Sequence, residues 1–237
     1  MRSATKSALE DLLRERRLAA DAPPLRGEDR RRRPLPTGIA PVDALLSGGF
    51  PRGELSEVFG PSSSGRTGLV QALLARSTQG GALAAFVDPA DRLDPASAAA
   101  AGVDLARLLW LRGPFRCPGP KVLAEAVSAV GTLAISGLFE VVVLDLAGVP
   151  EVERRRLPGA TWIRLQRMVE DASTALVLLA DGHVASGPGG LSLALAATGP
   201  RWSGPPGPGR MLSGLGAQAA AGRHSPRRAD FLLRTLA

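Results

Sequence analysis

The segment that decides the fold is the apolar stretch Leu55–Phe59 followed by Gly60-Pro61-Ser62-Ser63-Ser64-Gly65-Arg66-Thr67. An apolar strand before such a loop and a helical pattern after it form the context that the phosphate-binding motif G-x-x-x-x-G-K-[ST] requires. In that motif the glycines let backbone N–H groups turn toward phosphate, the helix N-terminus adds a favourable dipole, and the final hydroxyl holds magnesium. We therefore predict an α/β core built around a vestigial nucleotide site, whose loop residues are Gly60, Ser64, Gly65, Arg66 and Thr67.

The loop departs from the motif at one position, because Arg66 replaces the lysine. A planar guanidinium is bulkier than a compact ammonium and cannot occupy the same point between the β and γ phosphates of a nucleotide. We expect hydrolysis to suffer most, and weak binding of ATP with Mg²⁺ stays open without being required for function. The alternative is an ordinary turn rich in serine and glycine, which the flanking pattern disfavours.

Downstream of the loop, short apolar runs alternate with segments of helical period, the order that builds βαβ units. This order predicts a mostly parallel central sheet flanked by helices, with strands at 54–59, 82–88, 107–112, 139–146 and 174–181. An apolar stripe over 122–134 predicts a crossover helix. Further strands are expected at 191–198 and 229–236, separated by a mobile glycine- and proline-rich linker at 199–216. The alanine-rich patches 96–101 and 217–221 are expected in helices or loops.

The chain before residue 37 is expected to form a separate N-terminal part. Residues 7–21 place Leu9, Leu12 and Leu13 on one face of an isolated amphipathic helix, and Ser7 with Glu10 forms a capping-box pattern. Residues 22–36 are rich in proline and charge and predict an exposed tether, so the division is 1–36 for helix and tether and 37–237 for the core. The three leucines could dock onto a partner or fold back over the chain's own sheet.

The composition is that of an ordinary globular protein, with 45% hydrophobic and 22% charged residues. Lys6 and Lys121 are the only lysines among 29 basic residues, and the net charge of +7 favours polyanions or acidic partners, although solvated surface arginines would give the same count. The single Cys117 excludes an internal disulfide and fits the cytosol. His183 and His224 have no acidic or cysteine neighbours at ligand spacing, so no metal site is predicted. The apolar runs are too short to span a membrane.

Several further segments resemble the RecA recombinase core, over roughly residues 35–237. The opening is similar in Leu35-Pro36-Thr37-Gly38, in Val42-Asp43 and in Gly48-Gly49-Phe50-Pro51-Arg52-Gly53. The stretch from Phe86 to Pro95 resembles the RecA strand that carries the catalytic glutamate, and Val141 to Asp145 resembles its Walker B strand. The resemblance implies a RecA-like core, here with a short N-terminal helix and no RecA-type C-terminal domain.

The same resemblance implies that much of the catalytic apparatus of RecA is missing. The glutamate that activates the attacking water falls on Ala90, so no catalytic residue is expected. The nucleotide-sensing glutamine falls on Asp181, and the long DNA-binding loop beyond it is cut to 182–190. Asp145 keeps the Walker B carboxylate that reaches magnesium through water, which completes the vestigial nucleotide site.

A second region of interest is the arginine run that lies where the first DNA-facing loop of RecA would be. Arg154, Arg155 and Arg156 could neutralise phosphates without reading sequence, which predicts weak, non-specific DNA binding. A solvated charge run is the alternative, because no aromatic residue is interleaved to stack bases.

The RecA-like core, Arg66 and the short basic N-terminal helix together resemble the ImuA family of bacterial mutagenesis proteins. That resemblance implies a non-catalytic accessory protein of SOS-induced translesion DNA synthesis. It also implies contacts with RecA, with ImuB and with an error-prone C-family DNA polymerase, in the bacterial cytoplasm and at the nucleoid when DNA is damaged.

Two other functions stay open. A diverged, working RecA-type DNA-dependent ATPase would need Arg66 to replace the lysine and Asp91 to replace the glutamate. By the same resemblance, the lysines that RecA extends to a neighbouring subunit fall on Ala219 and Ala221, although Arg223 could substitute after a small shift. A SulA-like cell-division inhibitor shares the fold but needs no phosphate loop, so the retained loop argues against it.

Overall fold

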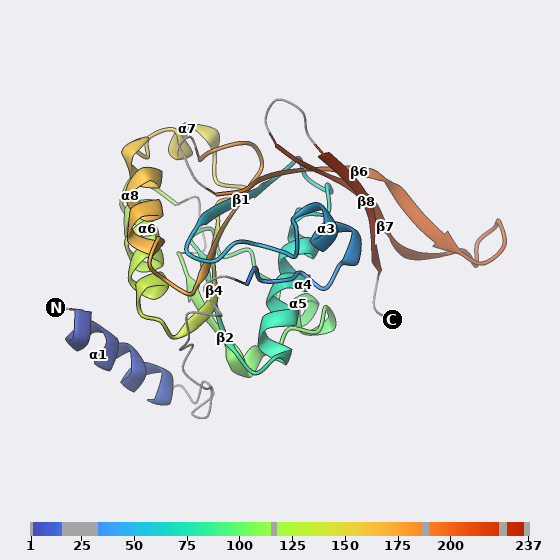
Figure 1. Cartoon of the computed structure of the whole chain (residues 1–237). Helices are drawn as coiled ribbons and strands as arrows, with labels where there is room; N and C mark the ends of the chain where they lie inside the picture. The colour runs from blue at the N-terminus through green and yellow to red at the C-terminus, as the bar shows by residue number, and fades with distance from the viewer. Residues whose placement is uncertain (1, 16–32, 115–117, 186–189, 223–226, 235–237) are drawn as a thin grey trace.

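The computed structural model describes residues 2–15, 33–114, 118–185, 190–222 and 227–234. Its centre is one eight-stranded sheet with the order β3-β2-β4-β5-β1-β6-β7-β8 (Figure 1). The strands are β1 Leu55–Phe59, β2 Leu83–Asp88, β3 Leu108–Arg112, β4 Phe139–Asp145, β5 Ala175–Ala180, β6 Ser192–Ser203, β7 Met211–Ala221 and β8 Arg227–Arg234. Pairing is parallel from β3 to β6 and antiparallel from β6 to β8, which confirms the predicted, mostly parallel sheet.

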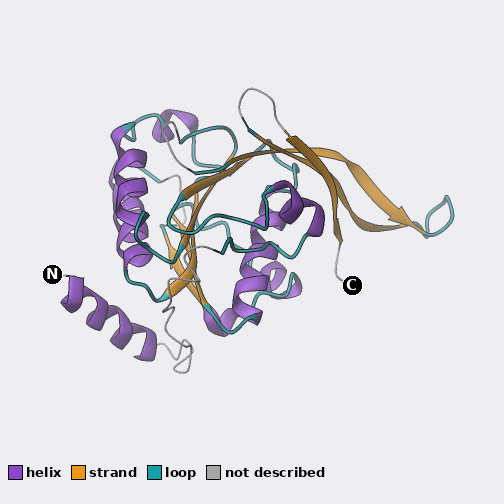
Figure 2. Ribbon diagram, in the orientation of Figure 1, coloured by secondary structure: helices purple, strands orange, loops and turns teal. Residues whose placement is uncertain are grey.

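Helices cover both faces of this sheet, giving three layers (Figure 2). They are α3 Ala40–Leu45, α4 Arg66–Gln79, α5 Pro95–Ala100, the 3-10 turn η1 Leu105–Arg107, α6 Pro120–Ile135, α7 Glu151–Arg154 and α8 Ala160–Val169. One core cluster contains side chains of α3, α4 and α5, and a second contains side chains of α6 and α8. The strands between them, such as β2 and β5, are buried at every residue, which explains why they are continuous apolar runs without alternation.

The N-terminal helix α1 spans Arg2–Glu15 and therefore begins before Ser7, so the predicted capping box does not mark its start. Leu13 is only 5% exposed and belongs to the second core cluster, and Leu9 packs against that cluster. The expectation that this helix lies outside the core is wrong for these two leucines, because burial of their apolar surface favours packing. Leu12 stays 39% exposed. Of the predicted tether, residues 16–32 lie outside the described part of the chain, and the division at residue 36 stays a prediction.

The segment 199–216 is a β-hairpin and not the predicted linker. β6 and β7 pair from Leu193↔Ala221 to Ser203↔Met211, and the hairpin projects from the body of the molecule (Figure 1). An antiparallel ladder satisfies backbone N–H and C=O groups whatever the side chains are, so glycine-rich strands can still pair. The register shifts near Gly199, whose φ of 126° suits glycine. The patch 217–221 is likewise strand, whereas 96–101 is mostly helix α5, as expected.

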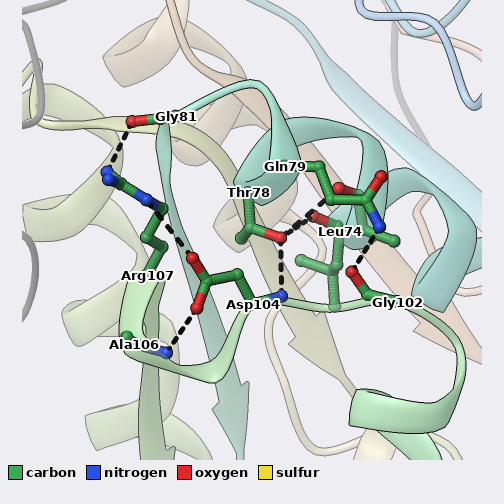
Figure 3. A network of polar contacts seen from close by, with 9 residues as sticks. Leu74, Thr78, Gln79, Gly81, Gly102, Asp104, Ala106 and Arg107 are labelled. Atoms are coloured by element: carbon green, nitrogen blue, oxygen red, sulfur yellow. Dashed lines mark hydrogen bonds and ion pairs between the residues drawn. The ribbon is translucent and has the colours of Figure 1, made fainter.

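A polar network fixes the C-terminal end of α4, the helix that begins at the phosphate loop (Figure 3). Asp104 N donates to Thr78 Oγ1 at 3.0 Å, and Gln79 Nε2 donates to the Gly102 carbonyl at 2.7 Å. Arg107 is 3.3 Å from Asp104 and completes the link to the turn before β3. These contacts hold the helix, and with it the loop, against the sheet. Among the described residues, none of the helices is both long and apolar enough to cross a membrane.

Candidate functional site

The candidate site lies at the carboxyl ends of the parallel strands, where open α/β sheets bind ligands. β1 leads into the phosphate loop, β2 and β4 end at Asp88 and Asp145, and Asp181 directly follows β5. Because β5 pairs with both β4 and β1, the loop, Asp145 and Asp181 come from three neighbouring strands. The fold thus brings the predicted nucleotide-site residues to one edge of the sheet.

The phosphate loop is tightly packed against the C-terminal strands. Gly65 precedes α4 with φ 90°, a left-handed conformation that glycine adopts without strain. A Cβ at this position would lie 2.9 Å from Leu233 Cδ1 and 3.2 Å from Ala217 Cβ. Ser64 is buried, whereas Thr67, which carries the final hydroxyl group of the motif, is exposed. The loop is therefore a strand-to-helix turn whose last residue before α4, Gly65, could not be replaced by a larger residue without strain.

Arg66 is buried in this loop, with only 7% of its surface exposed. Its Nη1 donates to the Gly60 carbonyl, and its Nη2 lies 2.5 Å from Asp181 Oδ1. Asp181 in turn accepts a hydrogen bond from Gly148 N through Oδ2, at 2.7 Å. The guanidinium is thereby turned toward the start of its own loop and neutralised by an internal carboxylate. In a working loop the cation at this position contacts nucleotide phosphates.

Asp145 lies at the end of β4 and is 7% exposed. The pKa of Asp145 is raised to about 7, mainly because the carboxyl group is buried. The 2.8 Å hydrogen bond that it accepts from Ala147 N acts in the opposite direction and lowers this pKa. The charge of Asp88 raises this pKa further, and Arg66 and Arg92 oppose it. The carboxyl group therefore keeps its proton to a higher pH than an ordinary aspartate does. A protonated carboxyl is a poor cation ligand, because metal ligands bind in their deprotonated form.

Ala90 lies in the turn after β2 and packs partly buried against the second core cluster. It offers no group that could activate water. The neighbouring Asp91 was the substitute that a working ATPase would need, and both of its carboxylate oxygens accept hydrogen bonds of 2.8 Å from Arg112. This contact lowers the pKa of Asp91, which makes it a weaker base. Arg112 Cζ lies 4.4 Å from the centroid of the Trp110 ring, so this contact on β3 helps to position the Arg112 side chain that binds Asp91.

The sequence of this chain matches a known protein family. The model of the RecA N-terminal domain matches residues 27–172, which is more than half of the chain. The chain belongs to the RecA N-terminal domain family. Among its relatives, Protein RecA of Thermus aquaticus is 38% identical over 135 residues, which cover 56% of this chain and 38% of that protein. Protein RecA of Symbiobacterium thermophilum is also 38% identical over 135 residues, covering 56% and 37%. The match thus spans well under half the length of these relatives.

The arginine run of this RecA-family chain is divided by the structure. Arg154 is directed inward, with its side chain 11% exposed and its Nη1 4.0 Å from Asp181 Oδ2. The Nε and Nη1 atoms of Arg154 are buried without a hydrogen-bond partner. Arg155 pairs with Glu151 at 2.5 Å and Arg156 with Glu153 at 2.9 Å. The three side chains therefore do not form one uncompensated basic face, and DNA binding at this run stays a prediction.

A buried acid on β1 escaped the sequence analysis. Glu57 is 1% exposed and accepts hydrogen bonds from the backbone N–H groups of Val184 and Ala185, at 2.5 and 3.1 Å. His183 Nδ1 lies 2.5 Å from its other oxygen, so this histidine has an acidic neighbour in space although none at ligand spacing in sequence. A carboxylate in the middle of an apolar strand was the available signal. The pair anchors the segment after β5. His224 lies outside the described residues.

Asp88 was also missed as a buried acid. Its Oδ2 accepts hydrogen bonds from Arg92 N, Leu93 N and Trp110 Nε1, at 2.7, 2.8 and 3.2 Å, while Oδ1 is buried without a partner. These bonds shape the turn that carries Ala90.

The two alanines that the RecA resemblance sets in place of subunit-bridging lysines lie on β7. Ala219 and Ala221 are 0% and 4% exposed and belong to the first core cluster. Arg223, the alternative cation, lies outside the described part of the chain.

Proposed function

We propose that this RecA-family chain is a non-catalytic accessory protein of SOS-induced translesion DNA synthesis that acts through contacts with other proteins. One observation carries the non-catalytic part, namely the ion pair between the buried Arg66 and Asp181, whose side chain is 32% exposed. Binding of a nucleotide phosphate by Arg66 would first require this pair to break, and leaving a buried charge without its partner is costly. Ala90 adds to the argument, because it cannot serve as a general base.

No cofactor is required by this proposal, although weak ATP and Mg²⁺ binding is compatible with the residues present. Thr67 and Asp145 would hold the metal ion, and the loop backbone would face the phosphates. The raised pKa of Asp145 weakens that site near pH 7.

The proposed partners are RecA, ImuB and an error-prone C-family DNA polymerase, as the ImuA resemblance implies. The relatives matched here carry the name Protein RecA, which supports a role beside DNA. Docking through α1 would use Leu12, since it is the exposed member of the leucine face. Leu9 and Leu13 pack against the chain's own core and could reach a partner only if the helix left it.

An ATPase assay with and without single-stranded DNA tests the catalytic part, with a RecA protein as the positive control. We expect turnover at background, because both the cation and the base are unavailable. Asp181→Ala frees Arg66 and should raise affinity for a fluorescent ATP analogue while turnover stays at background, since Ala90 is unchanged. DNA-stimulated turnover by the unmodified protein would instead establish the diverged ATPase.

Pull-down of purified RecA and ImuB tests the partner contacts. Leu12→Ser should weaken capture if α1 is the docking element, whereas Leu105→Ser is the matched control, because Leu105 is 40% exposed on the body of the protein. Equal capture by both variants and the unmodified protein would exclude Leu12 from the interface.

A further inference from the structure

The outer surface of helix α6 carries little charge for a helix that covers one face of a sheet. Its buried residues, among them Leu123 and Val130, belong to the second core cluster and face the sheet. Lys121 and Glu125 are the only charged residues in the sequence of this helix, so residues 126–135 carry no charge on any side. A helix that is solvated on its outer face normally bears charged or polar residues there. The composition of α6 is instead typical of a helix that another element covers.

A groove with a volume of about 390 Å³ runs between α6 and α8, which lie side by side (Figure 1). The lining residues of α6 extend from Ala124 to Thr132 at alternating spacings of three and one, and those of α8 extend from Thr161 to Met168 in the same way. These spacings select one face of each helix. With the rise of an α-helix, the two lined stretches are about 12 Å and about 10 Å long. The groove therefore follows two helical turns on each side.

Gly131 brings the two helices close together at the floor of the groove. A Cβ at Gly131 would lie 2.7 Å from Met168 Cε and 3.6 Å from Leu165 Cδ2. Gly131 and Leu165 are buried, whereas Met168 is 37% exposed and both Ser128 and Arg164 are exposed. The groove thus has an apolar floor and a partly polar rim, which is the anatomy of a protein interface.

The charge at the rim of the groove is positive and uncompensated. Among the described residues that line it, Arg164 alone is charged. Arg164 forms no ion pair with any residue that the structure describes. Glu125, the acid of α6, lies 4.0 Å from Lys121 of its own helix and does not line the groove. A guanidinium beside an apolar floor is complementary to an apolar segment that carries a carboxylate.

We propose that this groove binds an amphipathic helix of a protein partner, whose apolar face packs over Gly131 and Leu165 and whose carboxylate side chain pairs with Arg164. Helices that bind in such grooves present apolar anchors three, four and seven residues apart, which is the length of two turns. A compact ligand fits less well, because ligand pockets enclose about 70–90% of their ligand and the rim here is exposed.

The inference rests on the proposed function in one respect, namely that the protein acts through contacts with other proteins. It uses neither the phosphate loop nor the exposed Leu12 of α1. The ATPase assay and the pull-down with Leu12→Ser therefore test the proposed function without the groove, and failure of the groove leaves both results unchanged.

Selection from a phage-displayed library of helical peptides, with the full-length protein as bait, tests the proposal. The selected peptides should share apolar residues at helical spacing with an aspartate or glutamate beside them. The most enriched peptide is then synthesised, and its affinity is measured by fluorescence anisotropy. Arg164→Glu should weaken binding by more than about tenfold, because like charges then face each other. Arg167→Glu is the matched control, since Arg167 is exposed on the same helix but does not line the groove, and it should leave the affinity nearly unchanged.

Two further measurements separate the groove from general attraction by a basic protein. Ser128→Trp places a large side chain at the exposed rim and should abolish binding, while the thermal unfolding temperature shows that the variant folds. A peptide with lysine in place of its acids should bind Arg164→Glu better than it binds the unmodified protein. Equal losses in Arg164→Glu and Arg167→Glu, or a failure to enrich any peptide, overturn the proposal. Self-association that Ser128→Trp abolishes would also overturn it, because the groove would then hold a second copy of the chain.

Discussion

Helix α7 with its following turn and the β6–β7 hairpin both present arginines, but their charges have different fates. Arg155 and Arg156 lie beside Glu151 and Glu153, so this region neutralises itself. Arg201 and Arg210 have no acidic neighbour on their hairpin and flank an exposed tryptophan. A count of basic residues alone would favour α7 and its following turn as an anion-binding site, because the arginines there are consecutive. The comparison shows that the availability of a charge depends on its compensation by neighbours and not on its density in the sequence.

Arg66 extends this comparison to the interior. Gly60 and Asp181 accept hydrogen bonds from its two Nη atoms within the phosphate loop region, whereas its Nε is buried without a hydrogen-bond partner among the described residues. The arginines therefore form a series from a partly buried ion pair, through surface pairs, to side chains that form no ion pair with the described residues. The effects expected from removing them follow the same order.

The largest effect is expected for Arg66→Ala. Removal of the guanidinium leaves the Asp181 carboxylate without its main counter-charge, and breaking such a pair should lower the free energy of unfolding by about 3 kcal/mol. Urea unfolding measures this change. The double-mutant cycle with Asp181→Ala should give a coupling well above that of a surface pair. A loss no greater than that of Arg155→Ala would show that the buried pair does not stabilise the loop.

A pH-dependent effect is expected from Asp145. In the folded protein its pKa is raised to about 7, so between its ordinary value of 3.8 and 7 the folded state holds a proton that the unfolded state has released. Stability should therefore fall as pH rises through this window, by at most about 1.4 kcal/mol for each pH unit, and the contribution is lost above pH 7.

Asp145→Asn removes the titration and should flatten this part of the stability profile. Unfolding by urea at pH 5 and pH 8 gives the measurement, and the variant should gain more stability relative to the unmodified protein at pH 8 than at pH 5. The opposite sign would mean that Arg66 and Arg92 outweigh burial at this carboxyl group.

The smallest effect is expected for the surface pair Arg156 and Glu153. Its guanidinium is 56% exposed, and pairs of this kind contribute about 0.2–1 kcal/mol. A double-mutant cycle with Arg156→Ala and Glu153→Ala measures the coupling, which should shrink further at high salt. A coupling as large as that of Arg66 with Asp181 would erase the distinction between the two regions.

Much of the sheet could be predicted because the buried parallel strands are short apolar runs between segments of helical period. The hairpin could not be predicted, because glycine, proline and alanine carry no pattern of alternation, and its pairing depends on hydrogen bonds between strands. The start of α1 at Arg2 was also missed. A capping pattern at Ser7 does not mark the start of the helix when the residues before it are helical as well.

The sequence by itself determined the α/β class and the place of the phosphate loop, and it carries Arg66 and Ala90 where the RecA resemblance predicts a lysine and a glutamate. These are local properties of residue type and spacing. Only the tertiary structure decided that Arg66 meets Asp181, that His183 meets Glu57, and that Arg210 lies beside the exposed Trp202. Each of these depends on distance and burial between groups far apart in the chain, because electrostatic energy follows separation in space and the local dielectric.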